Sequence, residues 1–166
     1  MTNTLPTTGR LAGIDFGTVR IGIAICDPTQ CLASPFENYV RQDLAADEQR
    51  FVRLVSEEKI VGFVVGLPIH TTGEESEKSR EARDFADWLQ RVTGVQVGFC
   101  DERYTTKEAM SHLRFTGMSS RKQKQRLDMI AAQILLASYL ESSRQGNPTN
   151  EPLDDNPLGD EAKEIR

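Results

Sequence analysis

The spacing of apolar residues changes near residue 43, and this change constrains the fold of the chain more than any other feature. Before it, short apolar or alternating segments cover residues 11–16, 20–26 and 31–40, with an Asp-Pro turn between the last two. After it, Leu44, Phe51 and Val55 recur at the spacing of a helix. Segments that follow one another so closely are expected to be antiparallel neighbours, whereas later strands joined by helices are expected to be parallel.

The second half of the chain alternates between helical and strand patterns. Residues 60–65 form a continuous apolar run, typical of a strand buried on both faces. Together the patterns predict an α/β fold with a mixed five-stranded sheet, three antiparallel strands then two parallel ones, flanked by helices. The remaining expected elements are a helix over 43–59, a loop over 67–77, a helix around 82–89 ended by Gly94, a strand over 95–100, a helix from Thr105, a basic loop over 117–124 and a final helix over 125–142.

One domain accounts for most of the 166 residues. Residues 10–142 contain the predicted elements, and residues 1–9 are polar and are expected to be a flexible lead. Residues 143–166 carry six acids, three bases and three prolines, which predicts a disordered acidic tail. No apolar run approaches the ~20 residues that span a bilayer, and the N-terminus does not resemble a secretory signal. With three cysteines and no CxxC spacing, we expect a cytoplasmic protein without membrane association.

The net charge of −5 conceals an uneven distribution. The tail contributes −3 of it, and residues 109–127 hold five bases and no acid. Such a stretch is either an ordinary solvated loop or a surface that contacts phosphates.

Three acids occupy positions where the neighbouring sequence predicts burial or a strand end beside a ligand site. Asp15 ends an apolar strand between Gly13 and Gly17, where a charge is costly unless it is paired or bound to a metal. Glu102 ends the last strand, and ligand sites gather beyond the carboxyl ends of parallel strands. Asp128 shares its helix stripe with Ala131, Ala132 and Leu135, so it is expected to face protein. Each acid has an ordinary alternative role. Asp15 would cap a turn at the end of its strand, Glu102 would be a polar residue where the strand enters a loop, and Asp128 would stabilise the start of its helix through the helix dipole.

These three carboxylates have no histidine partner, because His70 and His112 each stand alone. An oxygen-only set of ligands suits Mg²⁺ or Mn²⁺. Such metals usually keep open positions for water and substrate phosphates, which indicates phosphoryl chemistry.

Four motifs in order resemble the YqgF-like family, whose members are described as Holliday-junction resolvases and pre-16S ribosomal RNA processing nucleases. They are Gly-Ile-Asp-Phe-Gly-Thr-Val-Arg-Ile-Gly at 13–22, Val-Gly-Leu-Pro at 65–68 with Gly73, Asp-Glu-Arg at 101–103 with Thr105 and Thr106, and Lys124 followed by Asp128, Ala131 and Ala132. The resemblance covers about residues 10–142. It implies a ribonuclease H-like fold with Asp15, Glu102 and Asp128 as the catalytic, metal-binding trio.

The resemblance also implies that Gly66, Leu67 and Pro68 border the substrate. The other roles follow from chemistry: Asp15 would bridge the metals, and Glu102 and Asp128 would complete their shells. Arg103 and Lys124 would neutralise phosphates, with a surface ion pair as the alternative for each, and Thr18 and Arg20 would contact the substrate backbone. The expected substrate-binding residues are therefore Thr18, Arg20, Gly66, Leu67, Pro68, Arg103 and Lys124.

The expected function is a metal-dependent endonuclease that hydrolyses phosphodiester bonds in structured nucleic acid. Processing of the 5′ end of pre-16S ribosomal RNA is favoured, with cleavage of branched DNA as a Holliday junction resolvase as the alternative. We expect a monomer or weak homodimer. A non-catalytic nucleic-acid-binding module is a lower alternative, since binding polyanions needs no buried acids. Residues 13–18 also resemble the phosphate loop of actin-like ATPases and sugar kinases, but those close on nucleotide with a second domain.

Overall fold

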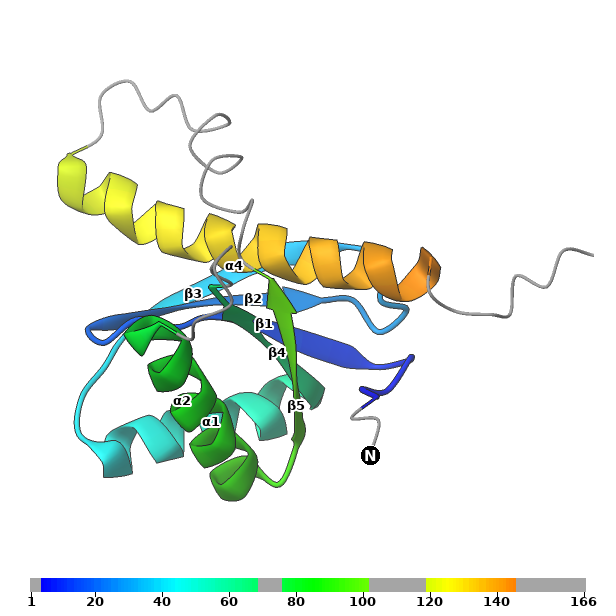
Figure 1. Cartoon of the computed structure of the whole chain (residues 1–166), viewed down its shortest axis with the longest axis horizontal. Helices are drawn as coiled ribbons and strands as arrows, with labels where there is room; N and C mark the ends of the chain where they lie inside the picture. The colour runs from blue at the N-terminus through cyan, green and yellow to red at the C-terminus, as the bar shows by residue number, and fades with distance from the viewer. Residues whose placement is uncertain (1–3, 69–75, 102–118, 146–166) are drawn as a thin grey trace, which may run out of the picture.

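A single sheet forms the centre of the computed structural model, which describes residues 4–68, 76–101 and 119–145 (Figure 1). β1, β2 and β3 pair antiparallel, and β1, β4 and β5 pair parallel. The predicted mixed five-stranded sheet is therefore confirmed. In their order across the sheet the strands are β3 (Ala33–Val40), β2 (Arg20–Cys26), β1 (Arg10–Asp15), β4 (Ile60–Leu67) and β5 (Gln96–Asp101).

Helices cover both faces of the sheet (Figure 1). α1 (Leu44–Glu58) and α2 (Glu77–Thr93) lie on one face, and α4 (Ser120–Gln145) crosses the other. The side chain of Asp43 caps the start of α1 by accepting from Ala46 N, and Ser76 does the same for α2. No helix within the described ranges has the length and apolar character to cross a bilayer.

Each face of the sheet carries its own apolar core. Toward α1 and α2, the strand residues Ile14 and Ile23 pack with Phe51 and Leu89. Toward α4, the strand residues pack against a stripe of that helix formed by Ala132, Leu136 and Leu140. The alternation of strand side chains places neighbouring residues of β1 in different cores.

The final helix is longer than the sequence predicted. It begins at Ser120, so the expected basic loop over 117–124 is wrong for residues 120–124, and it ends at Gln145 instead of residue 142. Its basic first turns contain Arg, Lys and Gln, which favour helices and carry no apolar signal of their own. At the far end, Arg144 donates to the carbonyl of Gln30 at 2.8 Å, which holds the last turn. The helix expected from Thr105 lies outside the described residues.

Residues 4–9, the described part of the expected N-terminal lead, contact the sheet. Leu5 is buried and lies above Gly62 and Gly98, whose missing side chains leave room for it. The Gln30 side chain donates to the carbonyls of Pro6 and Gly9, both at 3.0 Å. Residues 146–166, most of the expected acidic tail, lie outside the described part of the chain.

Candidate active site

Asp15 is the last residue of β1, the central strand. It pairs across the sheet with Gly22 of β2, while the preceding Ile14 pairs with Val65 of β4. Gly13, two residues before Asp15, faces α4, because a Cβ built on it would lie 2.8 Å from the carbonyl oxygen of Ala132. Alternation along the strand therefore directs the Asp15 carboxylate toward the α4 side as well.

Asp128 reaches the same place because α4 lies almost on the backbone of β2. A Cβ on Gly22 would come within 2.1 Å of the Asp128 carbonyl oxygen, so only a glycine permits this approach. Gly22 is the cross-strand partner of Asp15. The two acids, from the first strand and the last described helix, are thereby brought to neighbouring positions at one edge of the sheet.

Two side chains hold the Asp128 carboxylate. Arg20 Nε lies 3.2 Å from Asp128 Oδ2, and Asn38 Nδ2 donates to the same oxygen at 3.3 Å. Asn38 Nδ2 also donates to the carbonyl of Gln125 at 3.1 Å, which fixes the amide against α4. Among the described residues, Asp128 Oδ1 accepts no hydrogen bond, and the buried Asn38 Oδ1 has no partner either. Asp128 thus presents one oxygen that no group of the described residues occupies.

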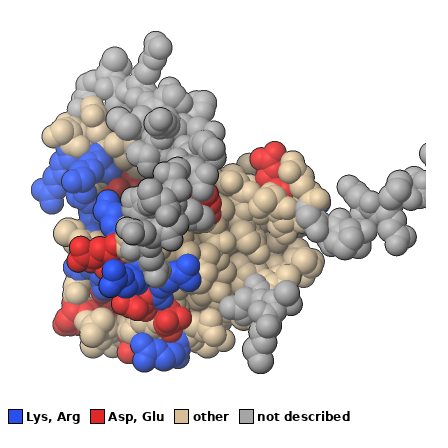
Figure 2. Space-filling view, viewed as in Figure 1, with Lys and Arg blue, Asp and Glu red and all other residues tan. Residues whose placement is uncertain are grey.

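A pocket of about 460 Å³ surrounds these acids. Its charged lining has equal numbers of acids (Asp15, Glu81, Asp128) and bases (Arg20, Lys78, Lys124). Further basic residues extend beyond it, and Figure 2 shows them gathered over the first turns of α4. The exposed bases there are Arg121, Lys122, Lys124 and Arg126. Acids placed among bases suit a site that must hold both cations and phosphates.

Most of the predicted site residues that the structure describes line this pocket: Asp15, Thr18, Arg20, Gly66, Pro68, Lys124 and Asp128. Leu67 does not, because its side chain is buried in the core toward α1 and α2. Glu102 and Arg103 lie outside the described residues. Within the described part of the chain, no three acidic, cysteine or histidine side chains are close enough together to hold a metal ion.

The sequence reasoning missed three contributors. Lys78 and Glu81 line the pocket from the first turns of α2, and Asn38 reaches Asp128 from β3. Polar residues at a helix start resemble any solvated helix face, so the sequence carries no signal for the first two. Asn38 stands in an edge strand with no motif around it.

Comparison with known proteins supplies the family. A family model described as "RuvX: Holliday junction resolvase" matches residues 9–142. The chain belongs to this family. It is 50% identical over 139 residues to a protein of Rhodopirellula baltica named "Putative pre-16S rRNA nuclease", covering 84% of this chain and 80% of that protein. A Koribacter versatilis protein of the same name is 35% identical, covering 87% of this chain and 94% of the relative. As a member of this family, the chain is a nuclease, a hydrolase of phosphodiester bonds.

A solved structure supports the fold. RuvC of T. thermophilus, in complex with a Holliday junction substrate, superimposes with a TM-score of 0.52 and 14% identity, covering 82% of this chain and 96% of that one. At this identity the likeness concerns the fold alone, and it confirms the predicted ribonuclease H-like architecture.

Proposed function

We propose that this RuvX-family nuclease is a metal-dependent endonuclease that cleaves structured nucleic acid at the pocket between β1, α2 and α4. Processing of the 5′ end of pre-16S ribosomal RNA is the first candidate reaction, since the relatives above carry that name. Cleavage of branched DNA is the second, because the family model is described by that activity. The setting would be the cytoplasm, and the active species a monomer or weak homodimer.

The observation that carries the proposal is the convergence of Asp15 and Asp128 in one pocket that three basic side chains also line. The two acids come from opposite ends of the described chain, and glycines at positions 13 and 22 permit the close packing that brings them together. A module that only bound nucleic acid would gain nothing from two acids among its bases, because each repels phosphate.

The donor set fits Mg²⁺ or Mn²⁺. Asp15 and Asp128 would supply carboxylate oxygens. Arg20 and Asn38 hold Asp128 Oδ2, and among the described residues none bonds to Oδ1. Glu102, the residue after β5, is the proposed third ligand. Hard oxygen donors of this kind are what these two metals prefer. When bound, they activate water and stabilise the leaving oxygen of a phosphodiester.

The protein groups around the acids have separate tasks. Arg20, paired with Asp128, fixes the orientation of that carboxylate and adds positive charge beside it. Lys124 and Lys78 enter the pocket from α4 and α2, where they would neutralise substrate phosphates on either side of the acids. Thr18, Gly66 and Pro68 form the wall along which the substrate backbone would lie, and Arg103 would contribute a further phosphate contact.

Cleavage assays with a pre-16S ribosomal RNA fragment and a four-way DNA junction, each in the presence of Mg²⁺, test the proposal. Asp15→Asn should abolish turnover of whichever of the two substrates the wild-type chain cleaves. The protein should stay folded, because the amide has the shape of the carboxylate but cannot replace it as a metal ligand. Asp87→Asn, at an exposed acid of α2 away from the pocket, is the matched control and should cleave normally. Normal cleavage by Asp15→Asn would refute the metal mechanism.

The Lys124→Ala variant tests the phosphate contact separately. Losing one phosphate contact should weaken substrate binding and reduce the slope of log affinity against log salt by about one unit. Binding titrations at several salt concentrations measure this slope. An unchanged slope would remove Lys124 from the substrate contacts without affecting the role of the acids.

A further inference from the structure

A second groove, of about 320 Å³, opens beside the candidate active site on the α1 and α2 side of the sheet. It shares Phe16, Thr18 and Glu81 with the pocket that contains Asp15. The groove is therefore continuous with the place where we propose that the phosphodiester is cut. Its other lining residues are Arg41, Leu44, Asp84, Phe85 and Trp88.

Stacked aromatic rings form one wall of this groove. The rings of Phe16 and Phe85 are stacked with their centroids 4.7 Å apart, and Trp88 continues the row at 5.5 Å from Phe85. Phe51, fully buried below, meets the edges of Phe85 and Trp88 at 5.7 and 6.2 Å. The row is thus fixed from behind, while Phe16 and Trp88 remain partly exposed.

A guanidinium group is held against this wall. The Arg41 Cζ atom lies 5.3 Å from the Phe16 ring centroid and 6.0 Å from that of Phe85. Arg41 Nε lies 3.3 Å from Asp47 Oδ2. Among the described residues, none bonds to the terminal nitrogens of Arg41, so these nitrogens can pair with an anion.

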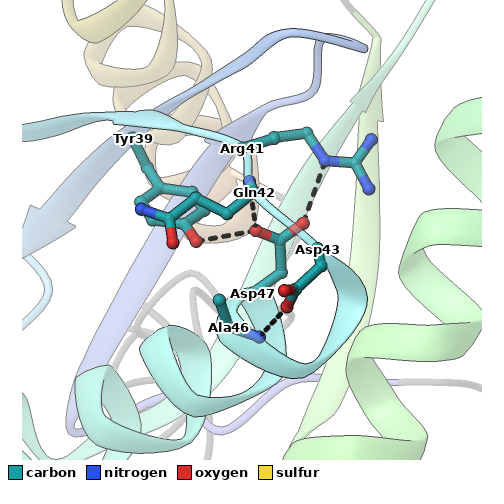
Figure 3. Close-up of polar contacts among 6 residues, drawn as sticks. All are labelled: Tyr39, Arg41, Gln42, Asp43, Ala46 and Asp47. Atoms are coloured by element: carbon teal, nitrogen blue, oxygen red, sulfur yellow. Dashed lines mark hydrogen bonds and ion pairs between the residues drawn. The ribbon is translucent and has the colours of Figure 1, made fainter.

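The anchor of Arg41 is a rigid one. Asp47 is almost completely buried in α1, and its Oδ1 accepts from Tyr39 Oη at 2.6 Å and from Gln42 N at 2.9 Å (Figure 3). Burial, with the hydrogen bond to Asp47, raises the pKa of Tyr39 to about 12, so the phenol keeps its proton and donates well into alkaline pH. Asp47 therefore fixes the position of Arg41 before any ligand arrives.

We propose that this groove binds one unpaired nucleotide of the substrate, next to the scissile phosphate, with its base on the aromatic wall and its phosphate at Arg41. The inference rests on the proposed function and deepens it. Unpaired bases are commonly held by stacking on aromatic side chains, and arginine pairs with phosphate through its planar fork. Glu81 and Asp84 share the face of α2 that carries Phe85 and Trp88. Their charges repel phosphate, so the phosphate should lie at Arg41, away from these two acids.

Such a subsite would give the enzyme a preference for substrates with an unpaired nucleotide at the cleavage position. A base within a continuous duplex is stacked on its neighbours and has no free face for the aromatic wall. Both an RNA single strand and an opened DNA junction can supply such a base, since stacking is indifferent to the sugar.

Trp88 is the only tryptophan of the chain, so its fluorescence reports on this groove alone. The probes are an adenylate hexamer, made as RNA and as DNA, and an abasic hexamer of equal length and charge, titrated into the full chain without metal. We expect quenching by the adenylate hexamer with either sugar, and none by the abasic hexamer at the same concentration. Equal responses to the adenylate and abasic hexamers, or no response to either, would overturn the proposal.

A surface variant provides the second test. Leu44 is 64% exposed at the first position of α1, where an acid is favourable to the helix dipole, so Leu44→Glu should fold normally. It places a negative charge at the mouth of the groove and should weaken adenylate binding about tenfold. Val52→Glu, at a 42% exposed position of the same helix outside the groove, is the matched control and should bind normally. Arg41→Gln is a poorer choice because it removes the ion-pair partner of the buried Asp47 and would destabilise the fold as well.

The two variants also separate this inference from the proposed function. If the wild-type chain cleaves its substrate and Leu44→Glu binds adenylate as tightly as Val52→Glu, the nucleotide subsite is wrong and the nuclease assignment stands. If quenching and the Leu44→Glu effect are found but Asp15→Asn cleaves normally, the subsite stands and the metal mechanism fails.

Discussion

Replacing Gly22 by alanine is the most incisive single perturbation of this site. The added Cβ would lie 2.1 Å from the carbonyl oxygen and 2.6 Å from the carbonyl carbon of Asp128. Both atoms belong to the helix backbone, so no side-chain rotation relieves the contact. The variant must separate α4 from β2 at the residue that carries a proposed metal ligand.

The magnitude follows from the size of the overlap. Real Cβ atoms essentially never approach other heavy atoms within 3.0 Å, so α4 or β2 must move by roughly 1 Å. Inserting a methyl group into a well-packed contact costs about 1–3 kcal/mol, and a contact with backbone should fall at the upper end. A misplacement of about 1 Å in a catalytic constellation lowers the rate by about 100-fold. The loss of turnover should therefore be large even where the variant remains folded.

Urea unfolding and single-turnover cleavage, measured on the same preparation, check both quantities. Gly94→Ala is the control, because its Cβ meets nothing within 4 Å while its φ of 71° still penalises alanine by about 1 kcal/mol. It should lose stability but retain the cleavage rate. Wild-type stability and turnover in Gly22→Ala would refute the close packing of α4 on β2, and with it the argument that brings Asp15 and Asp128 together.

Three further predictions concern other parts of the molecule. Asn38→Leu removes both hydrogen bonds to α4 and should reduce turnover while leaving substrate affinity nearly unchanged; a normal rate would deny Asn38 a positioning role. The pKa of Tyr39 is about 12 in the folded chain against 10.0 normally, so its stabilising effect is complete below pH 10 and is lost as the pH rises toward 12. Unfolding curves of Tyr39→Phe should lack that component of the alkaline decline, and an identical decline would contradict the assignment. Leu5→Ala should lower the free energy of unfolding by about 2–4 kcal/mol, whereas no change would indicate that the N-terminal segment is unattached.

Local periodicity was sufficient to predict the strands. The alternation of Ile21, Ile23 and Ile25 marks a strand between two different layers, and the apolar run from Ile60 marks one covered on both faces. The beginning of α4 could not be predicted in this way, because its basic first turns extend beyond the sheet and have no apolar face. Leu5 was missed for a related reason, since one buried leucine in a polar segment forms no pattern.

The candidate site residues were predictable where a charged residue occurs in an apolar stretch of sequence. Asp15 ends an apolar strand and Asp128 shares a stripe with small apolar residues, so both required an explanation from the sequence alone. The supporting contacts were not predictable, because Asn38 and Arg41 look like ordinary surface residues until the packing of α4 and α1 shows what they touch. Only the fold reveals that Phe16, next to Asp15 in sequence, stacks on Phe85 on the other side of the sheet and lines the second groove as well as the pocket.

The distance along the chain between Asp15 and Asp128 has a consequence for the timing of activity. Asp15 is synthesised near the beginning, whereas Asp128 is carried by α4, the last described element to leave the ribosome. Since α4 supplies both the carboxylate and one wall of the pocket, an incomplete chain has a nearly finished sheet but no site. For a nuclease proposed to act on ribosomal RNA precursors, this order of assembly keeps each new molecule inactive until its own translation has passed α4.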